Sequence, residues 1–232
     1  MRPLDYFYDS PASGPGHYPQ HFQYFFSGLV KVVFSLFFRP KIYGLEQFAK
    51  LPEGSGAIIS ANHRSYLDPV FLFPAFRKHN IRFMTKQEFF EITPAITRMA
   101  TWVGIFPIKR ASADMESVKR AVRMLKRGEY VGIFPEGTRI RKPGQTVSYH
   151  EGVAMIAALA KVPVVPLRIW NTEQICPEGK RFFRCPRVTL AFDEPLNITD
   201  ERFQSLAKEQ RYKAFVDAVM EKVYSIQPPR KV

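Results

Sequence analysis

Short apolar runs alternate with amphipathic stretches from residue 41 onward, and this alternation limits the possible folds more than any other feature. The pattern is typical of an α/β domain, in which strands and helices follow one another and pack in layers. Several runs are apolar throughout, as expected of strands that are covered on both faces. The sequence therefore predicts a central, mostly parallel or mixed sheet flanked by helices. We expect strands at residues 57–60, 81–85, 104–108, 130–134, 162–169 and 187–192.

Helical spacing of apolar residues marks three further segments. Between residues 114 and 127 they recur at helical intervals, and Gly128 follows as a C-terminal cap. Residues 152–161 are small and apolar, which favours a closely packed helix. The last helix is expected to begin near Asp200, a plausible N-cap.

The chain length of 232 residues suits one sizeable domain, or one domain with a short appendage. We predict a disordered lead-in at 1–20, a membrane-associating helical segment at 21–40 and the α/β domain at 41–232. The lead-in lacks the apolar core of a cleavable signal peptide. The run from 22 to 38 is the most apolar, but it is short for a spanning helix and carries Lys31. We expect this helix to lie in one leaflet or to dip into it; a buried core helix is the alternative.

A formal net charge of +13 indicates an anionic partner, either nucleic acid or a lipid surface. No aromatic RNA-binding strand, zinc-finger spacing or basic region with heptads supports nucleic acid. The many aromatic residues, 21 Phe and 10 Tyr, suit an interfacial surface. The expected helix at 114–127 carries a basic face that is either solvated or in contact with anionic lipid. This face consists of Lys119, Arg120, Arg123, Lys126 and Arg127.

The two cysteines, Cys176 and Cys185, match neither a zinc ribbon nor a redox CxxC motif. We expect reduced, non-catalytic thiols and a cytoplasmic compartment, with a local disulfide as the alternative. No metal site is predicted.

Polar residues that can carry chemistry follow the first expected strand, in the segment ANHRSYLDP at 61–69. A spacing of five would place His63 and Asp68 about 140° apart around a helix, so the pair needs a loop before the helix. Asp68 precedes Pro69, and its carboxylate could either cap the helix or turn back to His63. An imidazole held by a carboxylate presents its other nitrogen as a proton acceptor. The alternative is a loop histidine beside an ordinary N-cap aspartate.

A second polar segment, FPEGTR at 134–139, also ends a strand. Gly137 permits a tight turn, and Arg139 offers a forked donor that suits phosphate. Glu136 could accept hydrogen bonds from hydroxyls or fix Arg139. The segment therefore indicates a site for a polyol phosphate, although a solvated arginine after a common turn has the same pattern.

Two further expected strands contain residues that bear on the site or on the position of the strand in the sheet. GIFPIKR at 104–110 delivers Lys109 and Arg110 to a strand end, which suits either phosphate binding or surface solubility. VPVVPLRI at 162–169 contains prolines that ordinary ladder positions exclude, so we expect an edge or bulge position for this strand.

These four segments, in this order, resemble the motifs of the glycerophospholipid acyltransferase family, most closely the bacterial 1-acyl-sn-glycerol-3-phosphate acyltransferases. The resemblance covers roughly residues 57–169. It implies that His63 takes the proton of the acceptor hydroxyl and that Asp68 holds His63. It also implies that Arg110, Glu136, Gly137 and Arg139 bind the glycerol phosphate and that Pro166 is the proline of the fourth motif. Lys109 and Thr138, which lie beside these positions, are further substrate-binding candidates.

Arg64 and residues 149–152 depart from the family pattern. Arg64 stands where Gln or Ser is common, and it could contact a phosphate or face solvent. Tyr149 and His150 replace the usual Phe-Lys, which leaves the acceptor headgroup open.

The resemblance implies transfer of a fatty acyl chain to the 2-hydroxyl of 1-acyl-sn-glycerol 3-phosphate, giving phosphatidic acid. The alternative acceptors for the same type of reaction are glycerol 3-phosphate and a lyso-aminolipid. The donor is a thioester of coenzyme A or acyl carrier protein, with no metal or prosthetic group. The absence of a GxSxG elbow agrees with direct transfer. The expected location is the cytoplasmic face of the cell membrane, peripheral or monotopic. The competing class is a non-catalytic basic protein bound to anionic membranes or nucleic acid.

Overall fold

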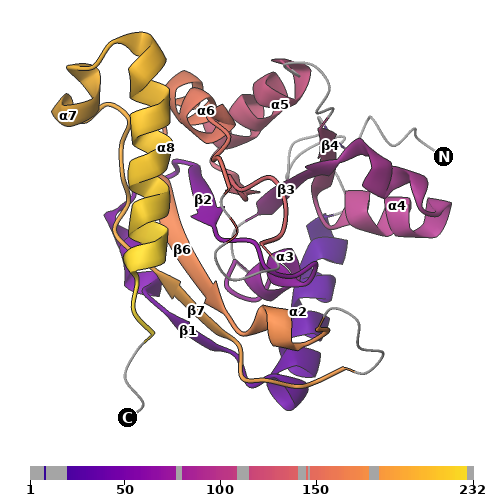
Figure 1. The fold of residues 1–232 in the computed structure, drawn as a ribbon. Coiled ribbons are helices and arrows are strands. Elements are labelled where there is room, and N and C mark those ends of the chain that lie inside the picture. Colours follow the sequence, from indigo (N-terminus) through magenta and orange to yellow (C-terminus); the bar gives the residue numbers. More distant parts are fainter. Residues whose placement is uncertain are drawn as a thin grey trace.

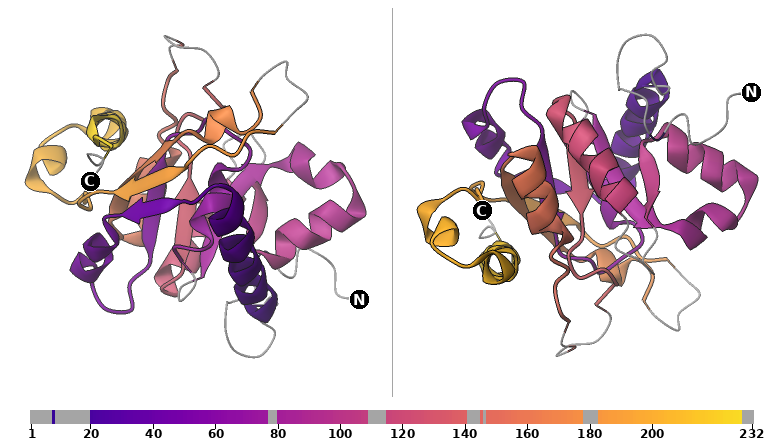
Figure 2. Two further views of the ribbon diagram at one scale, coloured as in Figure 1. Left: turned by 90° about the horizontal axis from the view of Figure 1, so that it is seen from below. Right: turned by 90° about the horizontal axis from the view of Figure 1, so that it is seen from above.

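The computed structural model describes residues 8, 20–76, 80–108, 115–140, 145, 147–177 and 183–228. Within these ranges seven strands form one sheet in the order β1-β7-β6-β2-β5-β3-β4, with helices on both faces (Figures 1 and 2). Only β6 and β7 pair antiparallel; the other neighbouring pairs are parallel. The predicted α/β fold with a mixed sheet is therefore confirmed. The strands are β1 (Lys41–Tyr43), β2 (Ala57–Ala61), β3 (Ile81–Lys86), β4 (Ile105–Ile108), β5 (Tyr130–Ile133), β6 (Val164–Trp170) and β7 (Thr189–Phe192).

All six expected strands are present, with ends that shift by a few residues. β1 was not predicted, because a strand of three residues is too short to show an alternation of its own. It pairs with β7 at the edge of the sheet and so covers what would otherwise be an open strand.

The expectation of an edge or bulge position for the proline-containing strand is wrong. β6 lies inside the sheet, between β7 and β2, and Pro166 is buried. The carbonyl of Pro166 accepts a hydrogen bond from the Asp193 N–H at 3.0 Å, so the proline nitrogen faces the same side. Because β7 ends at Phe192, the missing N–H falls just beyond the end of that ladder. A central strand tolerates this proline since no ladder bond is lost.

The expected helices at 114–127 and 152–161 are present as α5 and α6, and Gly128 has the positive φ of 80° expected of a C-terminal cap. The last helix is not continuous from Asp200: a short α7 comes first, and the long helix begins only at Lys208. The α-helices are α2 (Gln20–Phe37), α3 (Asp68–Leu72), α4 (Pro94–Trp102), α5 (Met115–Lys126), α6 (Gly152–Ala160), α7 (Glu201–Gln204) and α8 (Lys208–Ser225). Short 3-10 helices follow β1, β3 and β6: η1 (Leu45–Lys50), η2 (Gln87–Glu91) and η3 (Thr172–Gln174).

The core has two layers because successive residues of a strand point to opposite faces of the sheet. On β2, Ile58 packs with α5, α6 and α8, whereas Ile59 packs on the other face with α3 and with one side of α2. Both side chains are fully buried. Burial on both faces explains why the parallel strands are apolar throughout.

The helix α2 has two different apolar faces. Phe22, Phe26 and Phe34 pack against the core, and Phe26 meets Phe73 edge to face at 5.4 Å. The opposite face is solvent-exposed, with Leu36 at 70% and Phe37 at 56% exposure. Neither α2 nor any other helix within the described ranges combines the length and apolarity needed to cross a bilayer. The remaining exposed apolar residues of α2 are Phe25, Leu29, Val32 and Val33.

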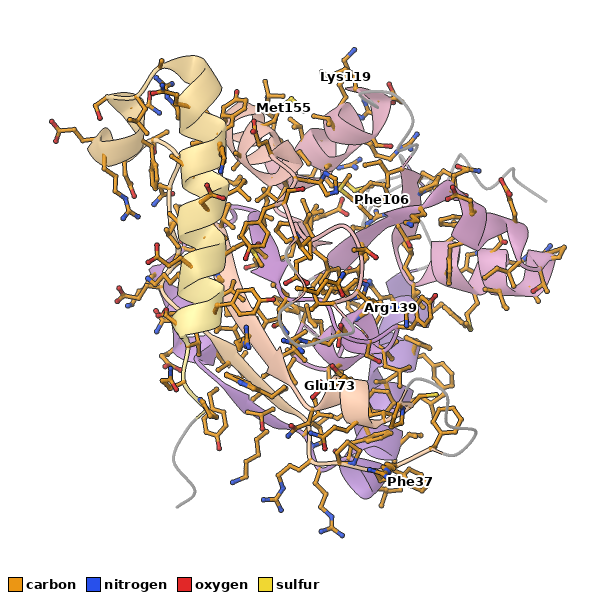
Figure 3. The ribbon with its side chains drawn as sticks, viewed as in Figure 1. Phe37, Phe106, Lys119, Arg139, Met155 and Glu173 are labelled. Carbon is orange, nitrogen blue, oxygen red and sulfur yellow. The ribbon has the colours of Figure 1, made fainter. Side chains whose placement is uncertain are left out.

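The basic face of α5 lies on the other face of the sheet from α2, and Figure 3 shows Lys119 and Phe37 at opposite ends of the molecule. Arg123 pairs with Glu116 at 3.0 Å, and Arg127 pairs with Glu129 at 3.2 Å. A bilayer that contacts the exposed face of α2 would therefore not contact this face, which favours the solvated alternative.

Two further expectations concern the cysteines and the lead-in. Cys176 and Cys185 are free and exposed, as expected of reduced thiols. Most of the lead-in lies outside the described residues; the described Tyr8 is buried and packs edge to face on Phe90 at 5.7 Å.

Candidate active site

The candidate site lies where the neighbouring parallel strands β2 and β5 end. Both strands deliver a polar loop to the same edge of the sheet, which is where α/β folds place their ligands. The Ile140 N–H donates to the His63 carbonyl at 2.9 Å, so the two loops are joined. The His63 ring also stacks on Phe134, with centroids 4.4 Å apart. Residues 61–69 and 134–139, which are distant in the sequence, thus form one structure.

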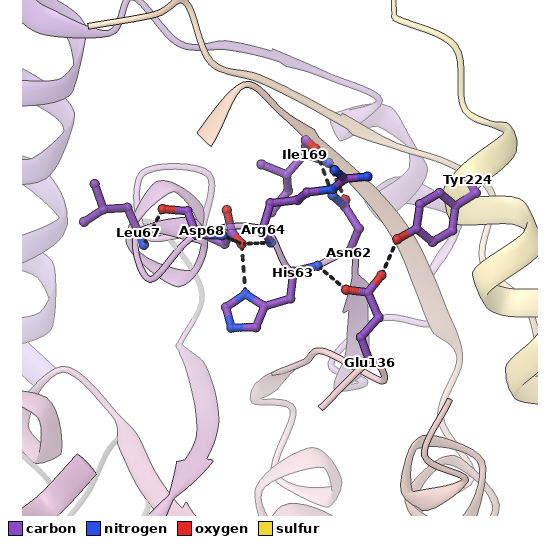
Figure 4. Close-up of polar contacts among 9 residues, drawn as sticks. Asn62, His63, Arg64, Leu67, Asp68, Glu136, Ile169 and Tyr224 are labelled. Carbon is purple, nitrogen blue, oxygen red and sulfur yellow. Dashed lines mark hydrogen bonds and ion pairs between the residues drawn. The ribbon is translucent and has the colours of Figure 1, made fainter. Parts of the chain in front are cut away.

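The structure brings His63 and Asp68 together (Figure 4). The distance between His63 Nδ1 and Asp68 Oδ2 is 2.9 Å. The same oxygen accepts the backbone N–H groups of Arg64 and Ser65, each at 2.7 Å. The Asp68 side chain is fully buried, whereas that of His63 keeps 18% of its surface exposed. Of the two predicted roles for Asp68, the carboxylate takes the turn back to His63 and makes no side-chain cap of α3.

This geometry selects the state of the imidazole. An N–H on Nδ1 donates to the Asp68 carboxylate, which leaves the lone pair of Nε2 as an acceptor. Because Asp68 is held by two backbone N–H groups, it is fixed before any ligand arrives. Chemically, the pair can take a proton from a hydroxyl placed at Nε2.

Glu136 is buried and binds the His63 loop from the other side. Its Oε2 accepts the backbone N–H of His63 at 2.8 Å, and its Oε1 accepts the hydroxyl of Tyr224 from α8. Burial raises the pKa of the Glu136 carboxyl, although the bonds from Tyr224 and His63 act in the opposite direction. Burial, together with the Glu136 charge, likewise raises the pKa of Tyr224.

The carboxylate of Glu136 is thus used to hold the loop. Within the described residues it makes no ion pair with Arg139, the partner considered from the sequence. Tyr224 was not predicted, because it lies 88 residues from Glu136 and its position on α8 has no motif around it.

Arg139 and Thr138 lie on the open side of the same turn. The guanidinium of Arg139 stacks on the ring of Tyr66, with its carbon 3.4 Å from the ring centroid. Tyr66 is 73% exposed, and Thr138 is also exposed. The turn itself depends on Gly137, which has a φ of +60°, a left-handed conformation that a side chain would strain.

The other predicted site residues divide into three groups. Lys109 and Arg110 lie outside the described residues, directly after β4. Pro166 is buried in β6 opposite Ser60 and offers no polar group to a ligand. The side chain of Arg64 is half-buried and turns away from the His63 imidazole (Figure 4). No group of three or more His, Cys, Asp or Glu in the described part of the chain could hold a metal ion.

Asn62 closes the edge between β2 and β6 and was not predicted as a site residue. Its amide donates to the carbonyl of Ile169 at 2.9 Å and accepts the Ile169 N–H at 2.7 Å. This buried pair of bonds imitates a strand ladder and fixes the position at which the His63 loop leaves the sheet.

The fold and this site define an α/β protein that holds a histidine and a buried carboxylate beside a cationic turn. A family model described as Acyltransferase matches residues 39–170. The chain is 30% identical over 203 residues to a 1-acyl-sn-glycerol-3-phosphate acyltransferase of Bacillus subtilis (strain 168), covering 88% of this chain and 96% of that protein. The chain belongs to the acyltransferase family.

Two more comparisons extend this relationship. A chloroplastic 1-acyl-sn-glycerol-3-phosphate acyltransferase of Brassica napus is 34% identical over 146 residues, which are 62% of this chain and 40% of that longer protein. The crystal structure of the 1-acyl-sn-glycerophosphate (LPA) acyltransferase of Thermotoga maritima has a TM-score of 0.65 at 24% identity. It covers 88% of this chain and 80% of that one, so the two share a fold.

Proposed function

We propose that this chain transfers a fatty acyl group from an acyl thioester to the 2-hydroxyl of 1-acyl-sn-glycerol 3-phosphate, giving phosphatidic acid. The observation that carries the proposal is the bond of 2.9 Å between His63 Nδ1 and Asp68 Oδ2, which leaves Nε2 as a base at the open edge of the sheet. The family membership and the names of the relatives support the same reaction.

The proposed reaction is a direct transfer. Nε2 of His63 takes the proton of the 2-hydroxyl as its oxygen attacks the thioester carbonyl, and the Asp68 carboxylate stabilises the resulting imidazolium. The tetrahedral intermediate then collapses, the carbon–sulfur bond breaks, and the imidazolium returns its proton to the thiolate. The products are the new ester and a free thiol. General-base catalysis contributes roughly a hundred- to ten-thousandfold, and positioning and oxyanion stabilisation supply the rest.

The proposed acceptor site uses the cations around the His63 loop. Arg139, presented on the open side by Tyr66, would bind the phosphate of the acceptor, together with Lys109 and Arg110 after β4. Glu136 and Gly137 would shape the turn that presents Arg139. The acyl donor, a thioester of coenzyme A or acyl carrier protein, is a co-substrate, and the proposed reaction uses no metal or prosthetic group.

The proposed location is one leaflet of the cell membrane at its cytoplasmic face. The exposed apolar face of α2 supports this proposal, because Leu36, Phe37 and their neighbours offer a continuous surface for acyl chains. A lysophospholipid acceptor resides in the same leaflet, so the enzyme would meet its substrate there.

Replacement of His63 by alanine tests the assignment. We expect His63→Ala to lose at least a hundredfold in turnover of 1-acylglycerol 3-phosphate with radiolabelled acyl-CoA, while liposome binding is unchanged. His21→Ala is the matched control, since His21 is exposed on α2. Glycerol 3-phosphate and a lyso-aminolipid are compared as acceptors, and acyl carrier protein as donor carrier. Full turnover by His63→Ala would exclude the proposed mechanism, and a preference for another acceptor would exclude the proposed substrate.

A further inference from the structure

A half-buried arginine on β6 has donor groups that nothing in the described structure satisfies. Arg168 lies near the end of β6, the strand that pairs with β2 beside the His63 loop. Its Nε and Nη1 atoms have no access to solvent and no hydrogen-bond partner. Among the described residues no carboxylate forms an ion pair with it. A buried donor without a partner is unfavourable, and a charged one more so.

The surroundings of Arg168 orient its guanidinium. Its carbon lies 4.2 Å from the ring centroid of Tyr224 and 5.9 Å from that of Trp170. The hydroxyl of Tyr224 is bound to Glu136, which in turn holds His63, so the aromatic platform beneath Arg168 is fixed by the catalytic loop. Stacking on an aromatic face leaves the edge of a guanidinium free for an oxygen ligand in its plane.

A second cation faces the same space. The side chain of Arg64 extends from the His63 loop away from the imidazole (Figure 4). Burial lowers the pKa of the Arg168 guanidinium, and the positive charge of Arg64 acts in the same direction. Glu136, whose charge acts on Arg168, already accepts two hydrogen bonds. The space between α8 and the His63 loop therefore has an excess of positive charge.

We infer that Arg168 and Arg64 form a phosphate-binding subsite on the α8 side of the His63 loop, separate from the stack of Arg139 on Tyr66. Because Nε and Nη1 of Arg168 have no access to solvent, the guanidinium would turn on its Tyr224 stack to bring them to two phosphate oxygens, and Arg64 would supply the second charge. The subsite as an anion site stands on the geometry alone; its assignment to a substrate rests on the proposed function. Because the acceptor has a single phosphate, which the proposed function assigns to Arg139, the expected source is the nucleotide or pantetheine part of the donor. An acceptor phosphate at this subsite would instead exclude Arg139 as its ligand, and the experiment distinguishes these two sources.

The first arm measures binding without catalysis. The melting temperature of the full chain in detergent is recorded in inorganic phosphate and in chloride at equal ionic strength. Because a ligand of the native state raises its stability, phosphate should raise the melting temperature of the wild type more than that of Arg168→Leu, which keeps the proposed phosphate site at Arg139. Arg202→Leu is the matched control, since Arg202 also stacks on an aromatic ring, Phe203 at 4.5 Å, but is exposed on α7. Arg168→Lys keeps the charge without the fork and should retain part of the shift.

The second arm identifies the source of the phosphate. The KM for 1-acylglycerol 3-phosphate at saturating acyl-CoA is compared with the KM for acyl-CoA at saturating acceptor. We expect Arg168→Leu to raise one of the two by about ten- to a hundredfold, the effect of one charge-assisted hydrogen bond. An acceptor phosphate predicts that 1-acylglycerol, which lacks phosphate, is insensitive to the change. A donor phosphate predicts that an acyl-N-acetylcysteamine thioester is insensitive.

The two arms separate a failure of the subsite from a failure of the proposed function. If the phosphate shift is equal in the wild type, Arg168→Leu and Arg202→Leu, the subsite is excluded, whatever the chain acylates. If the shift is reduced only in Arg168→Leu but the chain does not acylate lysophosphatidic acid, the subsite stands and the proposed function fails. Should the leucine variant not fold, Arg168→Lys carries the test, and an unchanged phosphate shift and unchanged KM values in that variant would overturn the inference.

Discussion

The two sides of the His63 loop differ in how firmly their side chains are held. On the inner side, Asp68 and Glu136 are buried, and their carboxylates bind backbone N–H groups of the loop. On the outer side, Arg139 rests on the exposed ring of Tyr66, and the described structure gives its guanidinium no carboxylate partner. The anionic groups of the site are therefore fixed by the protein, whereas the cationic ones are left for a ligand.

This difference has a physical reason. A buried carboxylate must be satisfied by the fold itself, because water cannot reach it. An exposed guanidinium can exchange water for phosphate at little cost, and an existing ion pair would only compete with the substrate. The inner side is thus expected to control the rate of the chemical step, and the outer side the affinity for the acceptor. The following predictions test this division.

The largest effect is expected from Asp68→Asn. The amide cannot stabilise an imidazolium, and its NH₂ group would occupy the place of Oδ1, which is buried without a hydrogen-bond partner in the described structure. We expect kcat to fall by about three to four orders of magnitude, as loss of the carboxylate does in other histidine-based sites, with a small change in the KM for the acceptor. Initial rates in mixed micelles measure both constants.

Asp217→Asn provides the matched control for this prediction. Asp217 lies on α8, and the one ion pair that it makes among the described residues is with the exposed Lys213, at 2.6 Å. Loss of such a surface pair should leave kcat within about twofold of the wild type. A kcat for Asp68→Asn within tenfold of the wild type would mean that His63 does not depend on the carboxylate.

An intermediate effect is expected from Tyr224→Phe, and it depends on pH. The Tyr224 hydroxyl donates to Glu136 and lowers the pKa of that carboxyl against the larger, opposite effect of burial. Removing the hydroxyl therefore raises the Glu136 pKa further, and the carboxylate that binds the His63 N–H is lost at a higher pH. The acidic limb of the pH–rate profile should move to higher pH, with a loss of up to about tenfold on the plateau.

Tyr212→Phe removes a hydroxyl from the same helix at a distance from the site. Its pH–rate profile should match that of the wild type. If Tyr224→Phe also leaves the acidic limb in place, Glu136 does not act through Tyr224, and the inner side is less tightly coupled than the hydrogen bonds indicate.

The sequence was sufficient to identify the side chains on the inner and outer sides of the His63 loop, but it did not determine the role of each one. The spacing of five between His63 and Asp68 correctly required a loop, because a helix would have separated the two side chains. FPEGTR correctly placed a tight turn at Gly137. For Glu136 the sequence offered hydroxyls or Arg139 as partners, whereas the structure binds it to the backbone N–H of His63 and to the hydroxyl of Tyr224 on α8.

The site residues that could not be predicted from the sequence have partners that are far away along the chain. Tyr224 and Asn62 act across 88 and 107 residues, respectively, and neither distance leaves a local pattern. Arg168 is a single charged residue in an apolar strand, and only the fold places it over Tyr224. The position of Pro166 was wrongly predicted since it depends on where β7, a different strand, ends. Strand and helix types follow from local patterns, whereas strand neighbours and buried polar contacts follow from the tertiary fold.

The smallest effect is expected on the outer side, from Tyr66→Ala. Loss of the ring frees the Arg139 guanidinium from its stack, and such an exposed contact contributes only about 0.5–1 kcal/mol. The KM for 1-acylglycerol 3-phosphate should therefore rise by about two- to fivefold at constant kcat, and Tyr66→Phe, which keeps the ring, should restore it. A fall in kcat instead would place Tyr66 with the groups that hold His63, and the division into a fixed inner side and an adaptable outer side would no longer describe the site.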